Sequence, residues 1–211
     1  MTISIENDFQ KLIRERRSVR KFLHEPIDPE LIAGAIDDAR FSPTPTNRQC
    51  YRFIAVSDPI ILQAMRQDIL ARIEEIAVRL SPDTAASFKE YAKWFTFFDQ
   101  APVVMFGLYR LFTSRLPDGG ESSRRLEGLA ELPAFGGAVH ALLLALHARG
   151  LGSCWMSGPL IADDKLESRL SLESPWRLGA VIPVGKAAQK PPTPRKPDPS
   201  AVFSWFPSPS E

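Results

Sequence analysis

The sequence has few of the residues on which disulfide and metal chemistry depend. Its 211 residues include two cysteines, Cys50 and Cys154, and three histidines. The cysteines have no CxxC spacing, so we expect free thiols in a reducing compartment, the cytoplasm. His140 and His147 lie seven residues apart, with no carboxylate or thiol at a metal-ligand spacing. We interpret them as packing residues and predict no metal site.

The common catalytic motifs are also absent. The chain has no Gly-x-Ser-x-Gly elbow, no Walker loop, no Gly-x-Gly-x-x-Gly loop and no His-Glu-x-x-His pair. Hydrolysis, phosphoryl transfer and zinc chemistry therefore lack their usual side chains. If the protein is an enzyme, this favours a reaction carried by a bound cofactor, with no catalytic side chain.

Neither net charge nor hydropathy is extreme. A net charge of +1, with 44% hydrophobic and 24% charged residues, is typical of one globular domain, spanning residues 1–211. A nucleic-acid-binding protein of this size normally has a basic face, so we expect no nucleic-acid partner. Residues 1–10 lack a basic segment followed by an apolar one, and no stretch is apolar for long enough to span a bilayer. We therefore expect no membrane partner.

Positive charge is concentrated near the N-terminus. Residues 14–21 carry a local charge of +4, and the Ser18 hydroxyl lies among the guanidiniums. This composition suits a small, doubly charged anion such as a phosphate monoester. A solvated helix end or a nucleic-acid patch would have the same composition.

A second basic element lies in the C-terminal tail, residues 190–211. Five of the residues from 190 to 199 are proline, which holds the segment extended, and Arg195 and Lys196 are adjacent within it. If the tail folds back onto the N-terminal cluster, the two form one anion site. The alternative is a plain linker.

Periodicity and turn residues predict helices alternating with strands. Apolar spacing indicates a helix at 29–40, with Asp28 as its N-cap, a buried strand at 102–109 and a strand with a proline near its end at 176–184. Residues 135–149 are apolar almost all round, which predicts a helix covered on every side, in the core or across a dimer seam. The aromatic cluster at 91–98 fits core or interface, and 110–131 is the candidate substrate-facing segment. Further helices are expected at 8–17, 58–80, 83–98 and 162–170, and further strands at 51–57 and 153–159.

Four motifs together resemble the nitroreductase family of FMN-dependent oxidoreductases. They are residues 16–20 (RRSVR), 42–49 (SPTPTNRQ), 150–158 (GLGSCWMSG) and 194–197 (PRKP), and they occur in the family's order across nearly the whole chain. The resemblance implies an α+β fold, a mixed central sheet flanked by helices, in an intertwined homodimer. Two FMN molecules would lie at the subunit interface.

The resemblance also implies roles for particular residues. Arg16, Arg17, Ser18 and Arg20 would hold the FMN phosphate, ribityl chain or ring edge, with Arg195 at the phosphate. The other subunit would contribute Pro43, Thr44, Pro45, Asn47 and Gln49 along the flavin. Ser157 and Gly158 would lie by the ring, where a backbone N–H donates to flavin N5. Ser157 and Thr193 depart from the acidic residue and the lysine of some members, and no middle-third amide contact is matched.

The activity implied is a ping-pong reaction in which NAD(P)H delivers hydride to flavin N5 and a nitroaromatic, quinone or enone then accepts the reducing equivalents. No side chain need act as a catalytic acid. Other reactions of the superfamily stay open: oxygen-dependent flavin cleavage, reductive dehalogenation and peptide or azoline oxidation. A third reading is a non-enzymatic module that binds a phosphate ligand or a protein partner.

Overall fold

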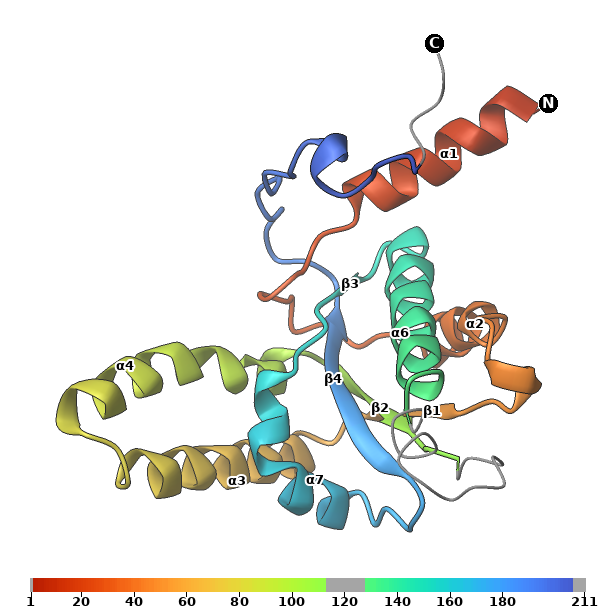
Figure 1. Ribbon diagram of the computed structural model, residues 1–211. Helices are drawn as coiled ribbons and strands as arrows, with labels where there is room; N and C mark the ends of the chain where they lie inside the picture. The colour runs from red at the N-terminus through yellow and green to blue at the C-terminus, as the bar shows by residue number, and fades with distance from the viewer. Residues whose placement is uncertain (1, 113–127, 207–211) are drawn as a thin grey trace.

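A computed structural model describes residues 2–112 and 128–206 of the chain (Figure 1). Most of the candidate substrate-facing segment, residues 113–127, lies outside the described residues. The fold is α+β, with helices on both faces of a four-stranded sheet. This confirms the fold class expected from the sequence.

The sheet has the strand order β1-β2-β4-β3. The strands are β1 (Tyr51–Val56), β2 (Val103–Tyr109), β3 (Gly152–Ser153) and β4 (Arg177–Gly185). All ladders between these strands are antiparallel. The sheet is therefore antiparallel, and not mixed as the resemblance implied; in the described residues, parallel pairing is limited to an isolated bridge between Ser18, outside the strands, and Ser153. β2 lies between β1 and β4 and is buried along nearly its whole length, as its apolar run predicted.

Successive residues of β2 point to opposite faces of the sheet and so build two separate cores. Val103 and Met105 pack with α2 (Pro29–Ala39) and α6 (Glu131–Ala148). Val104 and Phe106 pack with the opposite set of helices. That set consists of α3 (Pro59–Ala77), α4 (Pro82–Ala92) and α7 (Asp163–Arg169).

The helices expected from residues 29, 58, 83 and 162 begin within one residue of those positions, whereas α1 begins six residues before the expected residue 8 and α6 four residues before the expected residue 135. Asp28 caps α2 by accepting a 3.0 Å hydrogen bond from the Glu30 N–H, as expected. The helix expected to reach residue 98 ends at Ala92 and continues as 3-10 turns η2 (Lys93–Phe95) and η3 (Phe97–Gln100). These turns are tighter than an α-helix, and they direct Phe95 and Phe98 into the core.

The strand expected over 153–159 is also wrong beyond its first residue. β3 ends at Ser153, Met156 makes only an isolated bridge to Val181, and η4 (Gly158–Ala162) follows. Pro159 lacks an N–H and lies within the first turn of η4, so the chain does not return to the ladder after Met156.

Helix α6 is buried on one side only within a single chain. Phe135, Val139, Leu142 and Leu146 are buried. Its exposed or half-exposed residues recur along the opposite side, forming the open stripe: Pro133, Gly137, His140, Ala141, Leu144 and Ala148. The expected coverage on every side is therefore incomplete in one chain, and His140 is exposed, contrary to the packing role expected for it.

By length and composition alone, α6 could cross a membrane, so the expectation that no stretch is long enough was wrong. Its inner side packs against α2 and the sheet as a core helix does. The cytoplasmic location stays a prediction.

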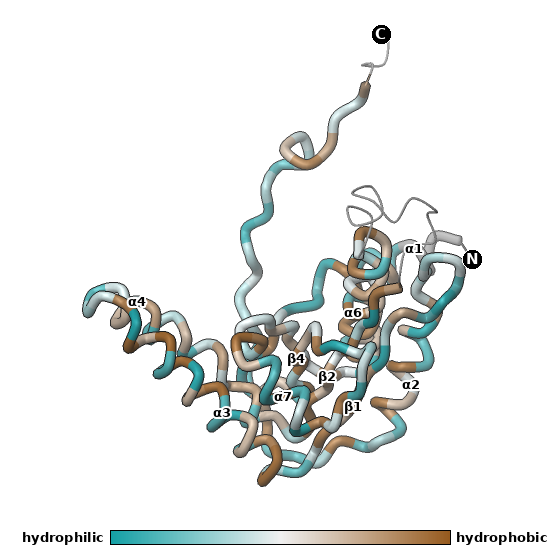
Figure 2. The backbone as a smooth tube through the Cα atoms, turned by 60° about the horizontal axis from the view of Figure 1, so that its bottom comes forward, coloured by the Kyte–Doolittle hydropathy of each residue, from teal (hydrophilic) through white to brown (hydrophobic). Residues whose placement is uncertain are grey.

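The two ends of the chain extend from this body. α1 (Thr2–Glu15) leads into the basic segment, and the tail runs away from the sheet, with a short turn η5 (Pro199–Ala201) near its end (Figure 2). Residues 190–206 of the tail are exposed except for Pro191, which is half-buried. The extended conformation expected from its prolines is confirmed.

Candidate functional site

The basic N-terminal segment is fixed to the sheet by backbone hydrogen bonds. The Val19 N–H donates to the Ser153 carbonyl over 3.0 Å, and the Leu23 N–H donates to the Lys186 carbonyl over 2.9 Å. The Ala188 N–H in turn donates to the Lys21 carbonyl over 3.0 Å. Residues 16–23 therefore run beside β3 and the end of β4, next to the start of the tail.

The start of the tail meets the basic segment. Arg17 Nη2 donates a 3.2 Å hydrogen bond to Thr193 Oγ1, which joins residues 176 positions apart. A cavity of about 750 Å³, here called the basic cavity, is lined from both ends of the chain. Its lining residues are Ile13, Arg14, Arg16, Arg17, Ser18, Arg20, His140, Pro191, Pro192, Thr193, Pro194 and Lys196. The two termini thus converge on one site, with Lys196, and not its neighbour Arg195, in the cavity wall.

The basic cavity has an unbalanced charge. Five of its lining side chains are cationic, those of Arg14, Arg16, Arg17, Arg20 and Lys196, and none is a carboxylate. Within the described part of the chain, none of these five forms an ion pair. Like charges held together without counter-ions favour binding of a multiply charged anion.

His147 lies close to this charge. It lines a neighbouring cavity with Arg16 and Arg17. Burial lowers the pKa of His147, and so does the Arg16 guanidinium, against a smaller raising effect of Glu15. A neutral imidazole therefore borders the basic segment.

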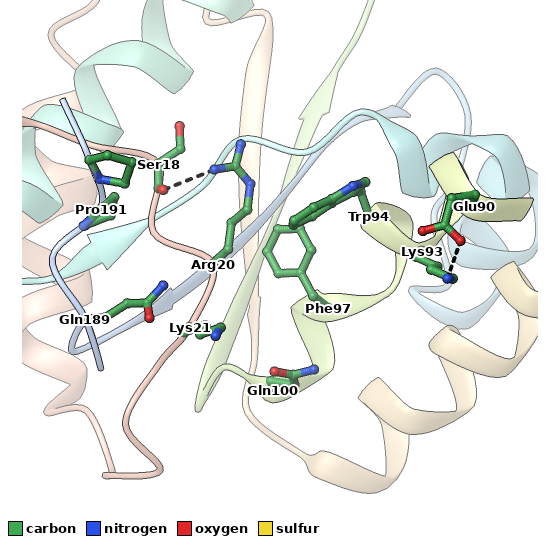
Figure 3. Close-up of a pocket in the computed structure, with 11 residues that line it drawn as sticks. Ser18, Arg20, Lys21, Glu90, Lys93, Trp94, Phe97, Gln100, Gln189 and Pro191 are labelled. Atoms are coloured by element: carbon green, nitrogen blue, oxygen red, sulfur yellow. Dashed lines mark hydrogen bonds and ion pairs between the residues drawn. The ribbon is translucent and has the colours of Figure 1, made fainter. Parts of the chain in front are cut away.

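A second cavity, of about 430 Å³, continues from Ser18 and Arg20 and has flat walls; we call it the aromatic cavity (Figure 3). Trp94 and Phe97 face Arg20 across it, and the Arg20 Cζ lies 5.9 Å from the Trp94 ring centroid. Gln189, just before the tail, and Pro191 of the tail lie on the opposite side. Lys93 and Glu90 form an ion pair at the far end, so Arg20 and Lys21 supply the unpaired charge.

Sequence reasoning missed several residues of the aromatic cavity. The cluster at 91–98 was interpreted as core or interface, and it divides: Phe95 and Phe98 are buried, whereas Trp94 is 58% exposed. Gln100 supplies an amide from the middle third of the chain, where no contact was matched. The sequence has no periodic pattern that predicts which way each side chain points in a 3-10 turn. The position of Trp94 next to the charged Lys93 was the one signal that it could face solvent.

The segment after β3 forms a third cavity, of about 500 Å³, with Arg20 and Trp94. Gly158 lines it and cannot carry a side chain, because a Cβ there would overlap the Phe95 ring. As the first residue of η4, Gly158 has an N–H with no carbonyl partner inside that helix. Cys154 also lines this cavity, and burial raises the pKa of its thiol, which disfavours the thiolate form. Ser157 is exposed beside the cavity but is not among its lining residues.

The loop at 42–49 lies elsewhere, between α2 and β1 (Figure 1). Thr46, Asn47 and Gln49 have positive φ angles of 48°, 55° and 52°, unusual for residues with side chains and a sign of stored strain. Internal hydrogen bonds hold this shape: the Gln49 N–H donates to Thr44 Oγ1 over 3.1 Å, and Gln49 Nε2 donates to Asn47 Oδ1 over 2.6 Å. Pro43, Thr44, Pro45, Asn47 and Gln49 line none of the cavities around Arg20. One chain therefore does not unite this loop with the basic segment.

Taken together, these features define an α+β protein in which residues from both ends of the chain line a basic cavity beside a cavity with aromatic walls. The sequence model of the nitroreductase family matches residues 13–186. The chain therefore belongs to the nitroreductase family, as its four motifs indicated.

Individual relatives differ in the reactions that their names describe. The chain is 26% identical to 5,6-dimethylbenzimidazole synthase of Rhodospirillum rubrum, covering 90% of this chain and 87% of that protein. Its fold is similar to that of a BluB-like flavoprotein from Clostridium difficile, with a TM-score of 0.85, 24% identity and coverage of 93% and 98% of the two chains. It is also similar to the FMN- and NADPH-dependent nitroreductase NfnB of a Sphigopyxis strain, with a TM-score of 0.73, 19% identity and coverage of 93% and 97%.

Proposed function

We propose that the protein is an FMN-dependent oxidoreductase that uses NAD(P)H to reduce nitroaromatic, quinone or similar electrophilic acceptors. The observation that carries this proposal is the basic cavity, with five cations and no carboxylate, opening beside the aromatic cavity. A phosphate monoester linked to a flat ring has complementary charge and shape. The relative NfnB, which is FMN- and NADPH-dependent, supports the same assignment.

The residues present fit FMN. Arg16, Arg17 and Ser18 would hold the phosphate and ribityl chain, since guanidiniums bind phosphate oxygens in pairs. Thr193 and Lys196 line the same cavity, and Arg195, beside them in the tail, is predicted to join them. The free Gly158 N–H would meet the ring edge at N5, with Ser157 next to it.

Bound FMN would supply hydride acceptance and donation at N5. Arg20 would stabilise negative charge at the ring, because a cation in a partly desolvated site acts on charge that develops during reduction. Trp94 and Phe97 would exclude water and offer flat surfaces to planar substrates. NAD(P)H and the acceptor would occupy the same face in turn, and no side chain needs to supply a proton.

We propose further that the active unit is a homodimer. The open stripe on α6 has small residues, which allow a second helix to approach closely. The strained loop at 42–49 lines no cavity around Arg20 in its own chain, and it would complete the site of the partner subunit.

The visible spectrum of the purified protein tests the proposed function. We expect bound flavin that is bleached by anaerobic NADPH and recovers its colour with a nitroaromatic or quinone. The double variant Arg16→Ala, Arg195→Ala should fold normally and lose FMN. A colourless protein that does not bind added FMN would contradict the proposed function. Full retention of FMN in the double variant would contradict the assignment of these arginines to the phosphate.

A second candidate reaction is the oxygen-dependent cleavage of reduced flavin. It is favoured by the similarity to 5,6-dimethylbenzimidazole synthase and to the BluB-like flavoprotein. Slow reduction by nicotinamide followed by rapid, oxygen-dependent loss of the flavin would support this candidate. Steady NADPH consumption with an added acceptor would support the first one.

A further inference from the structure

Five side chains form an alternating stack of arginines and aromatic rings where β2 ends; we call it the arginine stack. The Cζ atoms of Arg48 and Arg110 each lie 4.8 Å from the Phe112 ring centroid. The Cζ atoms of Arg110 and Arg52 lie 4.9 Å and 4.4 Å from the Trp176 ring centroid. Phe112 thus holds two guanidiniums, one from each of two loops.

The sheet topology brings these loops together. β1 and β2 are antiparallel with Tyr51 opposite Tyr109, so the start of β1 meets the end of β2. The Arg110 N–H donates to the Cys50 carbonyl over 3.0 Å, and Arg110 Nη2 donates to the Arg48 carbonyl over 3.3 Å. Arg48 belongs to the strained loop, and Arg110 and Phe112 begin the segment expected to face the substrate. Two segments selected on separate sequence grounds therefore share one stack.

The charge of the stack is not neutralised. In the described residues, no carboxylate lies within ion-pair distance of Arg48, Arg52 or Arg110. Burial raises the pKa of the Cys50 thiol; the buried Glu131 raises it further, and Arg110 lowers it, so both charged groups act on Cys50. Glu131 nevertheless forms no ion pair with Arg110. The Arg110 Nε is buried and has no hydrogen-bond partner among residues 2–112 and 128–206. A guanidinium stacked through its face keeps its in-plane N–H groups available for an anion.

We propose that Arg48 and Arg110 bind the anionic group of a planar aromatic acceptor and so select aromatic acids over neutral analogues. This inference rests on the proposed function, in which the loop at 42–49 lies along the flavin of the partner subunit. A carboxylate or phosphate accepts paired N–H groups from a guanidinium, and Phe112 fixes both guanidiniums before the ligand arrives.

Binding of benzoate and its neutral isostere benzamide to the oxidised, FMN-loaded protein tests the proposal. Binding is followed through changes in the visible flavin spectrum, so no turnover is needed. We expect benzoate to bind at least about tenfold more tightly than benzamide, because charge-assisted hydrogen bonds are stronger than neutral ones. Arg48→Gln and Arg110→Gln should abolish this preference. Arg79→Gln, at an exposed position after α3, should keep it.

Arg48→Gln is the decisive variant, because in the described residues the Arg48 side chain stacks on Phe112 and forms no ion pair. Equal binding of benzoate and benzamide by FMN-loaded wild-type protein, or an unchanged preference in Arg48→Gln, would overturn this inference alone. A protein that binds no FMN would overturn it together with the proposed function.

A comparison of NADPH with NADH separates the two sources of an anionic group. If the variants weaken NADPH relative to NADH and leave benzoate binding unchanged, the arginines bind the nucleotide phosphate and the acceptor assignment is wrong. If benzoate alone is affected, the acceptor assignment is supported.

Discussion

At the scale of single residues, the site depends on uncompensated positive charge. Arg17 joins the two chain ends through Thr193, and Arg16 lines two of the cavities between them. Thr193 contributes one hydroxyl to the site, at a position where the family resemblance implies a lysine in some members. The proposed phosphate site would therefore rely on guanidiniums from the N-terminal segment and on Lys196 from the tail.

We predict that Arg16→Ala weakens FMN binding by roughly tenfold to a hundredfold, because a hydrogen bond to a charged group contributes about 1.5–3 kcal/mol. Titration of the apoprotein with FMN, followed by flavin fluorescence, measures the effect. Arg79→Ala removes an exposed arginine outside the cavities and is the matched control. Equal affinities of the two variants would refute the assignment of Arg16.

FMN binding should raise the pKa of His147. Burial and nearby guanidiniums lower this pKa in the free protein, and the phosphate charge would offset those guanidiniums. A lowered pKa means that the unfolded chain takes up the proton first, so stability is lost as pH falls below about 6.5. FMN should reduce that loss. NMR titration of the His147 ring with and without FMN measures the shift, and His147→Gln identifies the resonance; an unchanged pKa would place the phosphate elsewhere.

At the scale of elements, the site is built where regular structure stops. α4 ends early, β3 is two residues long, and 3-10 turns follow both. These turns fit together closely, since Gly158 of η4 lies directly against Phe95 of η2. The sequence predicted the helices and long strands from period and caps, but not these turns, because three to five residues contain too few periods to recognise.

Gly158→Ala should lower the free energy of unfolding by about 1–3 kcal/mol, because the added methyl group overlaps the buried Phe95 ring. Urea unfolding measures the loss, and FMN affinity should fall with it. Gly136→Ala is the control: its Cβ would lie 3.6 Å from the nearest atom, in Trp155, and α6 should gain up to about 1 kcal/mol. Equal stability of the two variants would show that Phe95 can move aside.

At the scale of the whole molecule, one chain is incomplete in two ways. The open stripe leaves half of an apolar helix uncovered, and the loop at 42–49 lines no cavity around Arg20. In the proposed homodimer, one partner subunit would cover the open stripe, and the loop at 42–49 would complete the site of that partner.

Gly137→Glu should convert the proposed dimer into a colourless monomer. A Cβ at Gly137 meets no atom within 4 Å in its own chain, so the substitution should not disturb the monomer fold. In a dimer, the carboxylate would be buried against the facing helix without a counter-ion. Size-exclusion chromatography and the flavin spectrum provide the measurements, and Ala71→Glu, on the exposed side of α3, is the control. A Gly137→Glu protein that stays dimeric would move the interface away from the open stripe.

The sequence by itself determined the features that depend on neighbouring residues: the charge of residues 14–21, the cap at Asp28, the buried strand β2 and the four motifs that indicated the family. The tertiary structure alone decided which side chains share a cavity. It placed Lys196 in the wall ahead of Arg195, turned Trp94 outward from an aromatic cluster, and brought Arg48 and Arg110 onto one ring. Such contacts join residues far apart in the chain, and their geometry follows from packing and strand register, on which local sequence carries no information.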